Sequence, residues 1–149
     1  MSKQSKKSKP CIFCELAAGR AHAWRVQENE HSLAILDINP FTKGHCLVLP
    51  KRHVPWWHQM TEAETESLFA MARAVSRKMM KAFKPDFVMM YARGRRIPHT
   101  HVFLVPTFKG DLTDRYFHAL ELIQESPPAL TRLRRRTEMD RVLRTLKKT

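Results

Sequence analysis

The sequence has no apolar run as long as 18 residues, and its lysine-rich N-terminus is not followed by an apolar segment. Because of these two absences, we expect neither a membrane-spanning helix nor a signal peptide. A cytoplasmic protein is therefore expected. No internal repeat is visible, and 149 residues with 43% hydrophobic side chains suffice for one domain with a substantial core.

Acidic residues are scarce, 14 against 27 lysines and arginines, which gives a formal net charge of +13. The excess lies mainly at the two ends, because residues 1–10 contribute +4, residues 129–149 contribute +6 and only +3 remains for the middle. A run such as Arg134-Arg135-Arg136 can contact nucleic acid or another anionic partner through counterion release. A solvated helix with one charged face explains the same residues equally well.

Only three cysteines are present, and two of them, Cys11 and Cys14, have the C-x-x-C spacing whose thiolates can reach one zinc ion. His53 and His99 are the candidates for the remaining ligands of a closed Cys2His2 structural site. A redox pair is the alternative, but the thioredoxin-like βαβ pattern that usually surrounds one is absent. Scarce cysteine agrees with a reducing compartment, and Cys46 is expected to be a buried apolar side chain.

The stretch 97–106 alternates apolar with other residues and is bounded by prolines, which predicts a strand. Side chains two apart share a face of a strand, so His99, His101 and Phe103 are expected on one face. Two imidazoles in one row suit a metal site or nucleophilic catalysis. With His99 assigned to the metal, His101 keeps its ring free for chemistry.

The remaining patterns predict an α+β order of strands with one long helix packed across them. Thr61 and Glu64 form a capping box that starts this helix, which reaches about residue 83 and carries one apolar stripe. Pro127-Pro128 should separate two later helices. The other predicted elements are strands at 32–37, 45–49 and 87–91, a helical turn at 15–19, and helices at 113–125 and from residue 129 onward.

Four motifs follow one another along the chain: Cys11-Ile12-Phe13-Cys14, Leu36-Asp37-Ile38-Asn39-Pro40, Gly44-His45-Cys46-Leu47-Val48-Leu49-Pro50-Lys51-Arg52-His53 and Pro98-His99-Thr100-His101. In this order and at these separations, over about residues 11 to 108, they resemble the histidine triad (HIT) family of nucleotide hydrolases and transferases. The resemblance implies a HIT-like fold, an antiparallel sheet with one long helix packed across it, here with a C-terminal helical extension. It also implies a structural zinc ion and a homodimer whose sheets join across the interface.

By this resemblance, His101 is the nucleophile that attacks the α-phosphate of a nucleotide and holds a nucleotidyl-histidine until water hydrolyses it. Imidazole suits the role because one ring nitrogen attacks while the other, bonded to a backbone carbonyl, fixes the tautomer. His45 matches a histidine near the phosphates, and Asp37 matches the acid that binds the ribose, with a turn acid as the alternative. The expected apolar walls of the base pocket, for which core packing is the alternative, are Ile12, Phe13, Leu16, Ile35 and Ile38.

Phe103 stands where the family has the third histidine of its triad, a polar ring near the phosphate and the leaving group. Just upstream, Arg95 and Arg96 stand where the family commonly has neutral donors, and they can make charge-assisted contacts to phosphate. All three residues are therefore candidates for nucleotide binding. The two arginines predict a more anionic ligand or a different leaving group.

Three functions stay open. The first is a zinc-stabilised hydrolase or nucleotidyl transferase acting through His101 on a nucleoside phosphoramidate or dinucleoside polyphosphate. The second is a nucleotide-binding sensor or partner module without turnover, and the third is a nucleic-acid-associated protein that works through its basic tails. The expected organisation is a disordered basic tail (1–10), a HIT domain (11–110) and a basic helical extension (111–149).

Overall fold

The structure is a computed structural model that describes residues 10–92, 94–125 and 128–148. Contacts between Cα atoms divide the chain into two compact units, residues 1–109 and 110–149. The disordered tail predicted for residues 1–10 lies, apart from Pro10, outside the described residues.

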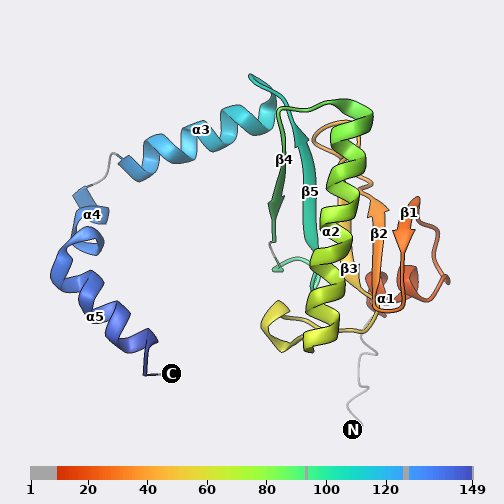
Figure 1. The fold of residues 1–149 in the computed structure, drawn as a ribbon, viewed down its shortest axis with the longest axis horizontal. Coiled ribbons are helices and arrows are strands. Elements are labelled where there is room, and N and C mark those ends of the chain that lie inside the picture. Colours follow the sequence, from red (N-terminus) through yellow and green to blue (C-terminus); the bar gives the residue numbers. More distant parts are fainter. Residues whose placement is uncertain (1–9, 93, 126–127, 149) are drawn as a thin grey trace, which may run out of the picture. The chain divides into compact units, whose positions relative to one another are not determined.

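The first unit is built on a five-stranded antiparallel sheet with the strand order β1-β2-β3-β5-β4 (Figure 1). This sheet confirms the predicted α+β fold, but its first strand has no counterpart in the sequence prediction. Only Val26 of that strand is a strong strand former, so the local pattern is weak. The strands are β1 (Arg25–Glu28), β2 (Ser32–Leu36), β3 (Cys46–Pro50), β4 (Phe87–Tyr91) and β5 (Val102–Thr107).

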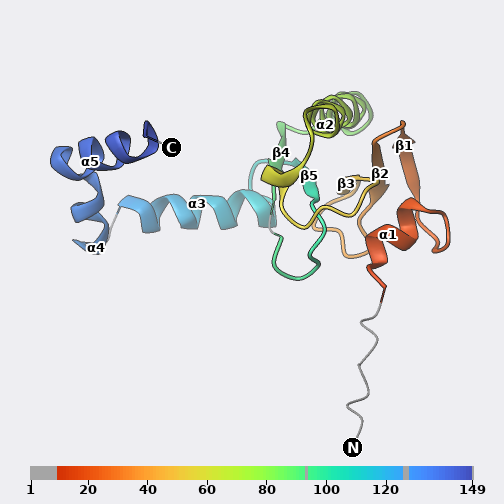
Figure 2. The same cartoon turned by 90° about the horizontal axis from the view of Figure 1, so that it is seen from below.

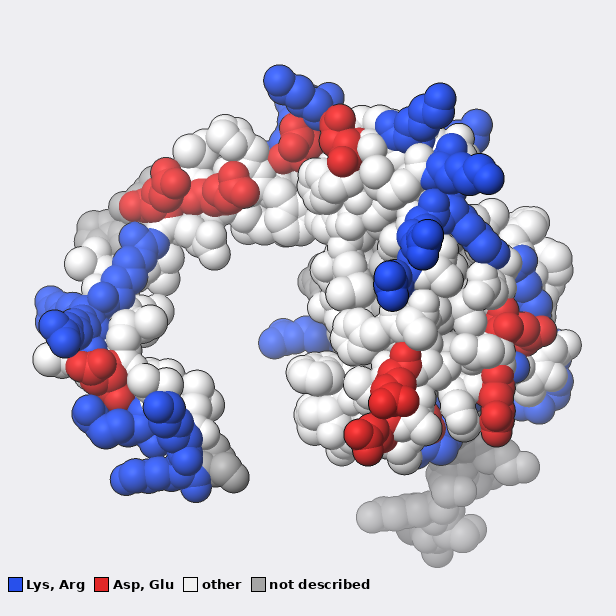
Figure 3. Space-filling model, in the orientation of Figure 1, with Lys and Arg blue, Asp and Glu red and all other residues white. Residues whose placement is uncertain are grey.

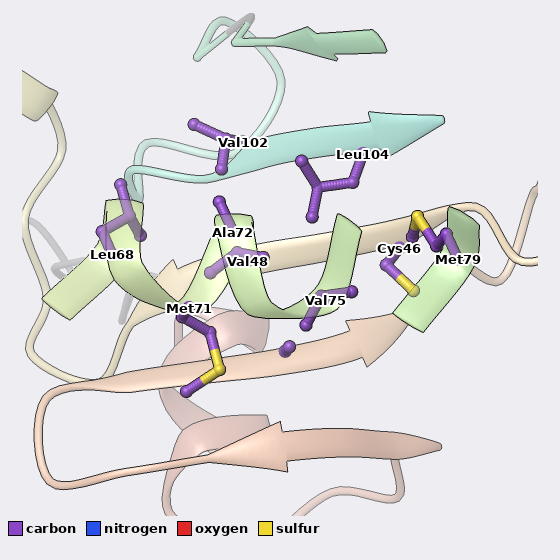
Figure 4. Packing of buried hydrophobic residues seen from close by; sticks show 10 residues of the cluster. Cys46, Val48, Leu68, Met71, Ala72, Val75, Met79, Val102 and Leu104 are labelled. Carbon is purple, nitrogen blue, oxygen red and sulfur yellow. The ribbon is translucent and has the colours of Figure 1, made fainter. Parts of the chain in front are cut away.

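The long helix α2 (Glu62–Phe83) covers one face of this sheet, and a 3-10 turn, η1 (Trp57–Gln59), precedes it (Figure 1). The predicted capping box is present, since the Thr61 hydroxyl accepts from the Glu64 N–H at 3.2 Å. The helix ends at Lys84, whose φ of 52° is left-handed. Its apolar stripe is buried against the sheet, which removes apolar surface from water and stabilises the fold. The cluster in Figure 4 comprises Ala34, Cys46, Val48, Leu68, Met71, Ala72, Val75, Met79, Val102 and Leu104.

Glu64 joins the start of α2 to the loop that follows β3. Its carboxylate accepts two hydrogen bonds from the Arg52 guanidinium, at 2.6 and 2.7 Å, and one from the Thr61 N–H at 2.9 Å. The Arg52 hydrogen bonds hold the pKa of Glu64 at about 2, against the opposing effect of burial. Since the ordinary value is 4.5, Glu64 favours the folded state only while it is ionised.

We therefore expect the first unit to lose stability as the pH falls from 4.5 towards about 2. The folded pKa is the lower one, so this contribution is complete above the unfolded pKa and disappears as the folded pKa is passed. Glu64→Gln should cost about 1–2 kcal/mol at pH 7, because Arg52 is exposed and water screens the pair. Urea unfolding across this pH range measures both effects. Glu62→Gln, an exposed change in the same turn, is the control, and an unchanged pH dependence in Glu64→Gln would contradict the assignment.

The opposite face of the sheet is covered by α1 (Ile12–Ala17), as Figure 2 shows. Its buried side chains Phe13 and Leu16 pack against Leu33, Ile35 and other residues of β2 and β3. The helical turn predicted at 15–19 thus starts three residues earlier and ends at Ala17. This start places the C-x-x-C motif at the beginning of a helix that the sheet holds in place.

The second unit consists of short helices. The helix predicted at 113–125 is confirmed as α3, whereas the last helix predicted from residue 129 is divided into shorter pieces. A 3-10 turn and the extended Arg135, with ψ at 136°, interrupt it, while Pro127 of the predicted break lies outside the described residues. No helix in the described ranges has the length and apolarity needed to cross a membrane. The helices are α3 (Leu112–Glu125), α4 (Pro128–Thr131), the 3-10 turn η2 (Arg132–Arg134) and α5 (Arg136–Leu146).

Candidate metal centre and histidine site

The histidine-bearing segment joins the sheet later than the sequence predicts. β5 starts at Val102, so the strand prediction for 97–106 is wrong for its first five residues. The Thr100 N–H donates to the Val54 carbonyl at 2.6 Å, outside the ladders of the sheet. His99 and His101 nevertheless face the same way, because both rings contact Phe13 of α1, at centroid distances of 5.7 and 4.9 Å.

Four potential metal ligands meet at the start of α1. Cys11 directly precedes the helix and Cys14 lies in its first turn, while His53 follows β3 and His99 precedes β5. Their ligand atoms all lie within 4.8 Å of one another. The fold thus brings together the complete Cys2His2 set that the sequence predicts.

The distances within this cluster suit a tetrahedral zinc ion. The Cys14 Sγ lies 3.3 Å from His53 Nδ1 and 3.6 Å from His99 Nδ1, and the Cys11 Sγ lies 3.5 Å from His99 Nδ1. Zn–S bonds of about 2.3 Å and Zn–N bonds of about 2.0 Å require sulfur-to-nitrogen edges of about 3.5 Å. The donor atoms and their spacing therefore fit a structural zinc site, which needs four protein ligands and no open position.

His99 is held in the orientation that a ligand requires. It is fully buried, and its Nε2 lies 2.8 Å from the Pro50 carbonyl, which assigns the ring proton to Nε2 and leaves Nδ1 facing the sulfurs. Burial lowers the pKa of His99 and thereby favours the neutral form that binds metal. Burial, and then the neighbouring Cys11, raise the pKa of the Cys14 thiol, so metal binding has to displace its proton.

His101 has one ring nitrogen fixed and the other available. The side chain is only 6% exposed, and the rings of Phe13 and Phe103 meet it edge-on, at centroid distances of 4.9 and 5.0 Å. Its Nδ1 lies 2.7 Å from the His99 carbonyl oxygen, which can only accept, so the proton is on Nδ1. Nε2 therefore keeps its lone pair, as a nucleophile requires.

His45 is a buried hydrogen-bond donor. Its Nδ1 accepts from the Phe41 N–H at 3.2 Å, which assigns the proton to Nε2. That N–H has no hydrogen-bond partner among the described residues, because Asp37 Oδ2 is 3.7 Å away. Burial lowers the pKa of His45 more than Asp37 raises it, so the ring is neutral. A buried donor without a partner carries a cost that a bound acceptor would remove.

The position directly before His45 requires glycine. Gly44 has a φ of 89°, and a Cβ at this position would overlap the ring of Phe83 at the end of α2. Asp37 accepts the Asn39 N–H on Oδ1 at 2.7 Å, the bond expected of a turn acid. Asp37 therefore stabilises the turn through Oδ1, and its other oxygen faces His45.

The ring of Phe103 contacts two histidines of the site, His45 and His101. Its ring centroid lies 5.0 Å from that of His101 and 5.7 Å from that of His45. It also stacks on Tyr91 of β4, at 4.6 Å and an interplanar angle of 9°. An apolar ring thus occupies the position at which the resemblance noted in the sequence leads us to expect a histidine.

The other predicted nucleotide contacts divide into buried and exposed groups. Phe13, Leu16 and Ile35 are buried in the core beneath α1, as the packing alternative predicted, whereas Ile12 and Ile38 are exposed. The predicted phosphate-binding residues Arg95 and Arg96 are also exposed, in the turns before His99.

Two residues of the site escaped sequence reasoning, Pro50 and Phe41. Pro50 acts through its carbonyl on His99, and Phe41 through its N–H and by stacking its ring on His45 at 5.3 Å. Backbone groups carry no signal in residue identity, so only the fold can reveal them.

Comparison with known proteins agrees with the fold. The HIT domain model matches residues 19–110. An uncharacterized HIT-like protein of Mycobacterium tuberculosis is 37% identical over 111 residues, which cover 68% of this chain and 74% of that protein. A Zn-bound histidine triad family protein from Mycobacterium smegmatis superposes with a TM-score of 0.64 and 30% identity, over 69% of this chain and 78% of that one. A hypothetical histidine triad nucleotide-binding protein from Sulfolobus tokodaii gives 0.63 and 28%, over 83% and 95%.

Proposed function

Since the chain belongs to the HIT family, we propose that it is a nucleotide hydrolase or nucleotidyl transferase that works through His101. The observation that carries this proposal is the 2.7 Å hydrogen bond between His101 Nδ1 and the His99 carbonyl, which leaves Nε2 as the nucleophile. The proposed substrate is a nucleoside phosphoramidate or a dinucleoside polyphosphate. The proposed catalytic domain comprises residues 11–110.

In the first step, His101 Nε2 forms a bond to the α-phosphorus, and the bond from phosphorus to the leaving group breaks with its electron pair. The ring then carries a positive charge. The His99 carbonyl stabilises this charge by accepting a hydrogen bond from the Nδ1–H group, which keeps its proton. The leaving group takes up one proton from solvent. In the second step, water attacks the phosphorus and gives one proton back to solvent, the P–N bond returns its electron pair to His101, and a nucleoside monophosphate is released. An acceptor other than water in this step gives nucleotidyl transfer.

The neighbouring residues have supporting roles in this proposal. The Nε2–H of His45 would donate to a phosphate oxygen, which fits its lack of a hydrogen-bond partner among the residues that the structure describes. Asp37 would bind the ribose hydroxyls, Arg95 and Arg96 the outer phosphates, and Phe103 would contact the nucleotide as an apolar surface. The exposed Ile12 and Ile38 would contact the base, above a floor of Phe13, Leu16 and Ile35.

A zinc ion would be held by Cys11, Cys14, His53 and His99. It would cross-link the start of α1, the segment after β3 and the segment before β5. His99 connects this role to the reaction, because its side chain faces the sulfurs and its carbonyl orients His101. All four ligand positions belong to protein side chains, so the substrate would not bind the metal.

The direct test follows the protein itself by intact mass spectrometry after mixing with adenosine phosphoramidate or a diadenosine polyphosphate. Samples are quenched with denaturant at alkaline pH, since a P–N bond to histidine is unstable in acid. The expected result is a protein mass increased by one adenylyl group, together with AMP in solution. Binding of the nucleotide without adduct or AMP would contradict the proposed activity.

A nucleotide-binding sensor is the second candidate, and Phe103 is the observation that favours it. A phenyl ring in contact with both His45 and His101 can neither bind phosphate through a hydrogen bond nor give a proton to a leaving group. In the sensor, the same residues would bind the nucleotide without cleaving it. The adduct experiment separates the two functions.

We also propose a homodimer joined through β4. This strand lies at the edge of the sheet, contains no charged residue, and exposes Phe87 and Met90, whereas edge strands that stay single usually carry charges. An apolar cavity beside it is lined by residues that include Trp57, Phe69 and Met90. Pairing with a second β4 would cover the edge and continue the sheet.

Met90→Lys is expected to raise the dissociation constant of this dimer by at least about tenfold, because the two-fold axis brings both new charges to one interface. Light scattering over a dilution series measures the change. Gln27→Lys places the same charge on the other edge strand, β1, and should leave the dimer intact. Equal behaviour of the two variants would place the interface elsewhere.

A further inference from the structure

The helix α5 exposes a narrow apolar row. Four apolar side chains recur at the spacing i, i+3, i+4 and i+7, which places them on one face of a helix with about 3.6 residues per turn. All four are exposed, by between 43 and 68%. Single exposed apolar residues are common on protein surfaces, but an aligned row on one helix face marks a contact surface. The row consists of Met139, Val142, Leu143 and Leu146.

The rest of the segment 132–148, which contains α5, is strongly basic. It has eight lysines and arginines against two acids, a net charge of +6. Figure 3 shows blue basic side chains gathered over this segment. With about 100° of rotation per residue, Arg136 and Lys147 lie directly beside Leu143 at one border of the row. The positive charge of the segment thus begins where the apolar row ends.

Both acids of the segment lie among basic residues. Glu138, at the other border of the row, accepts hydrogen bonds from Nε and Nη2 of Arg141, at 3.0 and 2.5 Å. These bonds lower the pKa of Glu138, so the pair stays ionised and its charges cancel. Asp140 lies one helical turn from both Arg136 and Arg144, whose positive charges offset its own. Neither acid therefore gives the row a negative border.

A partner that covers this helix has to be anionic and apolar at once. Nucleic acid would neutralise the arginines but would leave the apolar row in water. A groove in another protein would cover the row but would reach only the charges at its rims. The basic residues extend from Arg132 in η2 to Lys148, a longer stretch than the row covers. An anionic lipid surface attracts all of them, because its potential extends about 8 Å into physiological salt, and its acyl boundary takes up the row.

We propose that α5 lies along the surface of an anionic membrane, with its apolar row inserted between the lipids and its basic residues at the headgroups. With 11 residues the helix is about 16 Å long, so it lies in the interface and does not cross the bilayer. α5 belongs to the second unit, whereas the histidine site belongs to the first. The second unit is therefore a membrane-surface anchor whose action does not depend on the proposed reaction.

Sedimentation of the full-length protein with two kinds of vesicles tests this proposal. Vesicles of phosphatidylcholine mixed with phosphatidylglycerol should carry the protein into the pellet, and vesicles of phosphatidylcholine alone should leave it in solution. The bound fraction should fall as the salt concentration rises, because salt screens the attraction between the arginines and the lipid headgroups.

Three variants separate the apolar row from the charge. Leu143→Asp and Thr137→Asp lower the net charge equally, but Thr137 is exposed on the side of α5 opposite the row. Leu143→Asp should weaken binding to the phosphatidylglycerol vesicles at least about tenfold more than Thr137→Asp, because its carboxylate would have to enter the lipid. Leu143→Ala keeps the charge and favours the helix, and its affinity should lie between those of the other two.

Two results would overturn the proposal. Equal weakening by Leu143→Asp and Thr137→Asp would show that charge alone attracts the protein and that the row does not insert. A protein that stays in solution with both kinds of vesicles has no membrane anchor. If that protein also binds polyuridylate RNA, with the same affinity for wild type and Leu143→Ala, the arginines serve nucleic acid instead.

Discussion

Replacing His101 by alanine is expected to remove the adenylyl adduct and to lower AMP release by at least about 10³-fold, because the variant has no nucleophile for the first step. The zinc content should not change, since the imidazole of His101 is not among the four clustered ligands. Thermal stability should fall only moderately, by the packing lost between Phe13 and Phe103 and the hydrogen bond lost at the His99 carbonyl. Mass spectrometry, metal analysis and calorimetry on one preparation give all three values.

His31→Ala is the matched control, because it removes an imidazole that is partly exposed and outside the site. It should keep the adduct, the turnover and the metal. Retention of the adduct in His101→Ala would assign the nucleophile to another residue. Loss of zinc together with activity would show instead that His101 supports the metal centre, and the division of roles between His99 and His101 would be wrong.

The second large effect is expected for Cys14→Ser, which removes a ligand whose sulfur lies close to both clustered histidines. The variant should bind less than one tenth of the wild-type zinc, and its melting temperature should be lower by at least about 10 °C. The remaining ligands would then be held together without the ion that compensates their burial. Inductively coupled plasma spectrometry and calorimetry measure the two changes.

Cys46→Ala tests whether this effect belongs to the metal centre or to any lost cysteine. Cys46 is buried in the core under α2, where burial raises the pKa of its thiol to about 11, and it is not among the clustered ligands found in the described part of the chain. It should keep full zinc and lose about 1 kcal/mol of stability through a small cavity. A chelator should lower the melting temperature of wild type and Cys46→Ala and leave Cys14→Ser unchanged. A wild-type melting temperature that does not respond to the chelator would favour a redox pair at the C-x-x-C motif.

Local patterns predicted the parts of the fold in which one periodicity dominates. The capping box at Thr61 and the apolar stripe of α2 fixed the long helix almost to the residue. The strand β1 was missed because its four residues have little strand propensity of their own and are held by pairing with β2. The late start of β5 at Val102 was not predictable either, since it depends on the bond from the Thr100 N–H to the Val54 carbonyl, a contact set by tertiary structure.

The cluster of cysteines and histidines was predictable because the chain has only three cysteines and the C-x-x-C spacing is restrictive. The orientation of His101 was anticipated only in general terms, as a ring bonded to some backbone carbonyl, and the structure identifies that carbonyl as His99. The packing of Phe103 on Tyr91 was not predictable, because it depends on the register that places β4 opposite β5. The nucleotide contacts assigned to Arg95, Arg96, Ile12 and Ile38 stay predictions.

The spacing of the metal ligands also bears on how the chain folds and unfolds. Cys11 and His99 are 88 residues apart, and β5 can join β3 only after α2 has crossed the sheet between them. Such distant pairings form late and slowly, because a long loop must close first. In the proposed zinc site, the fourth ligand, His99, therefore arrives with the segment that precedes the last strand, and opening of that segment would separate it from the ion. The rate at which the metal is released would then report how often this part of the sheet opens.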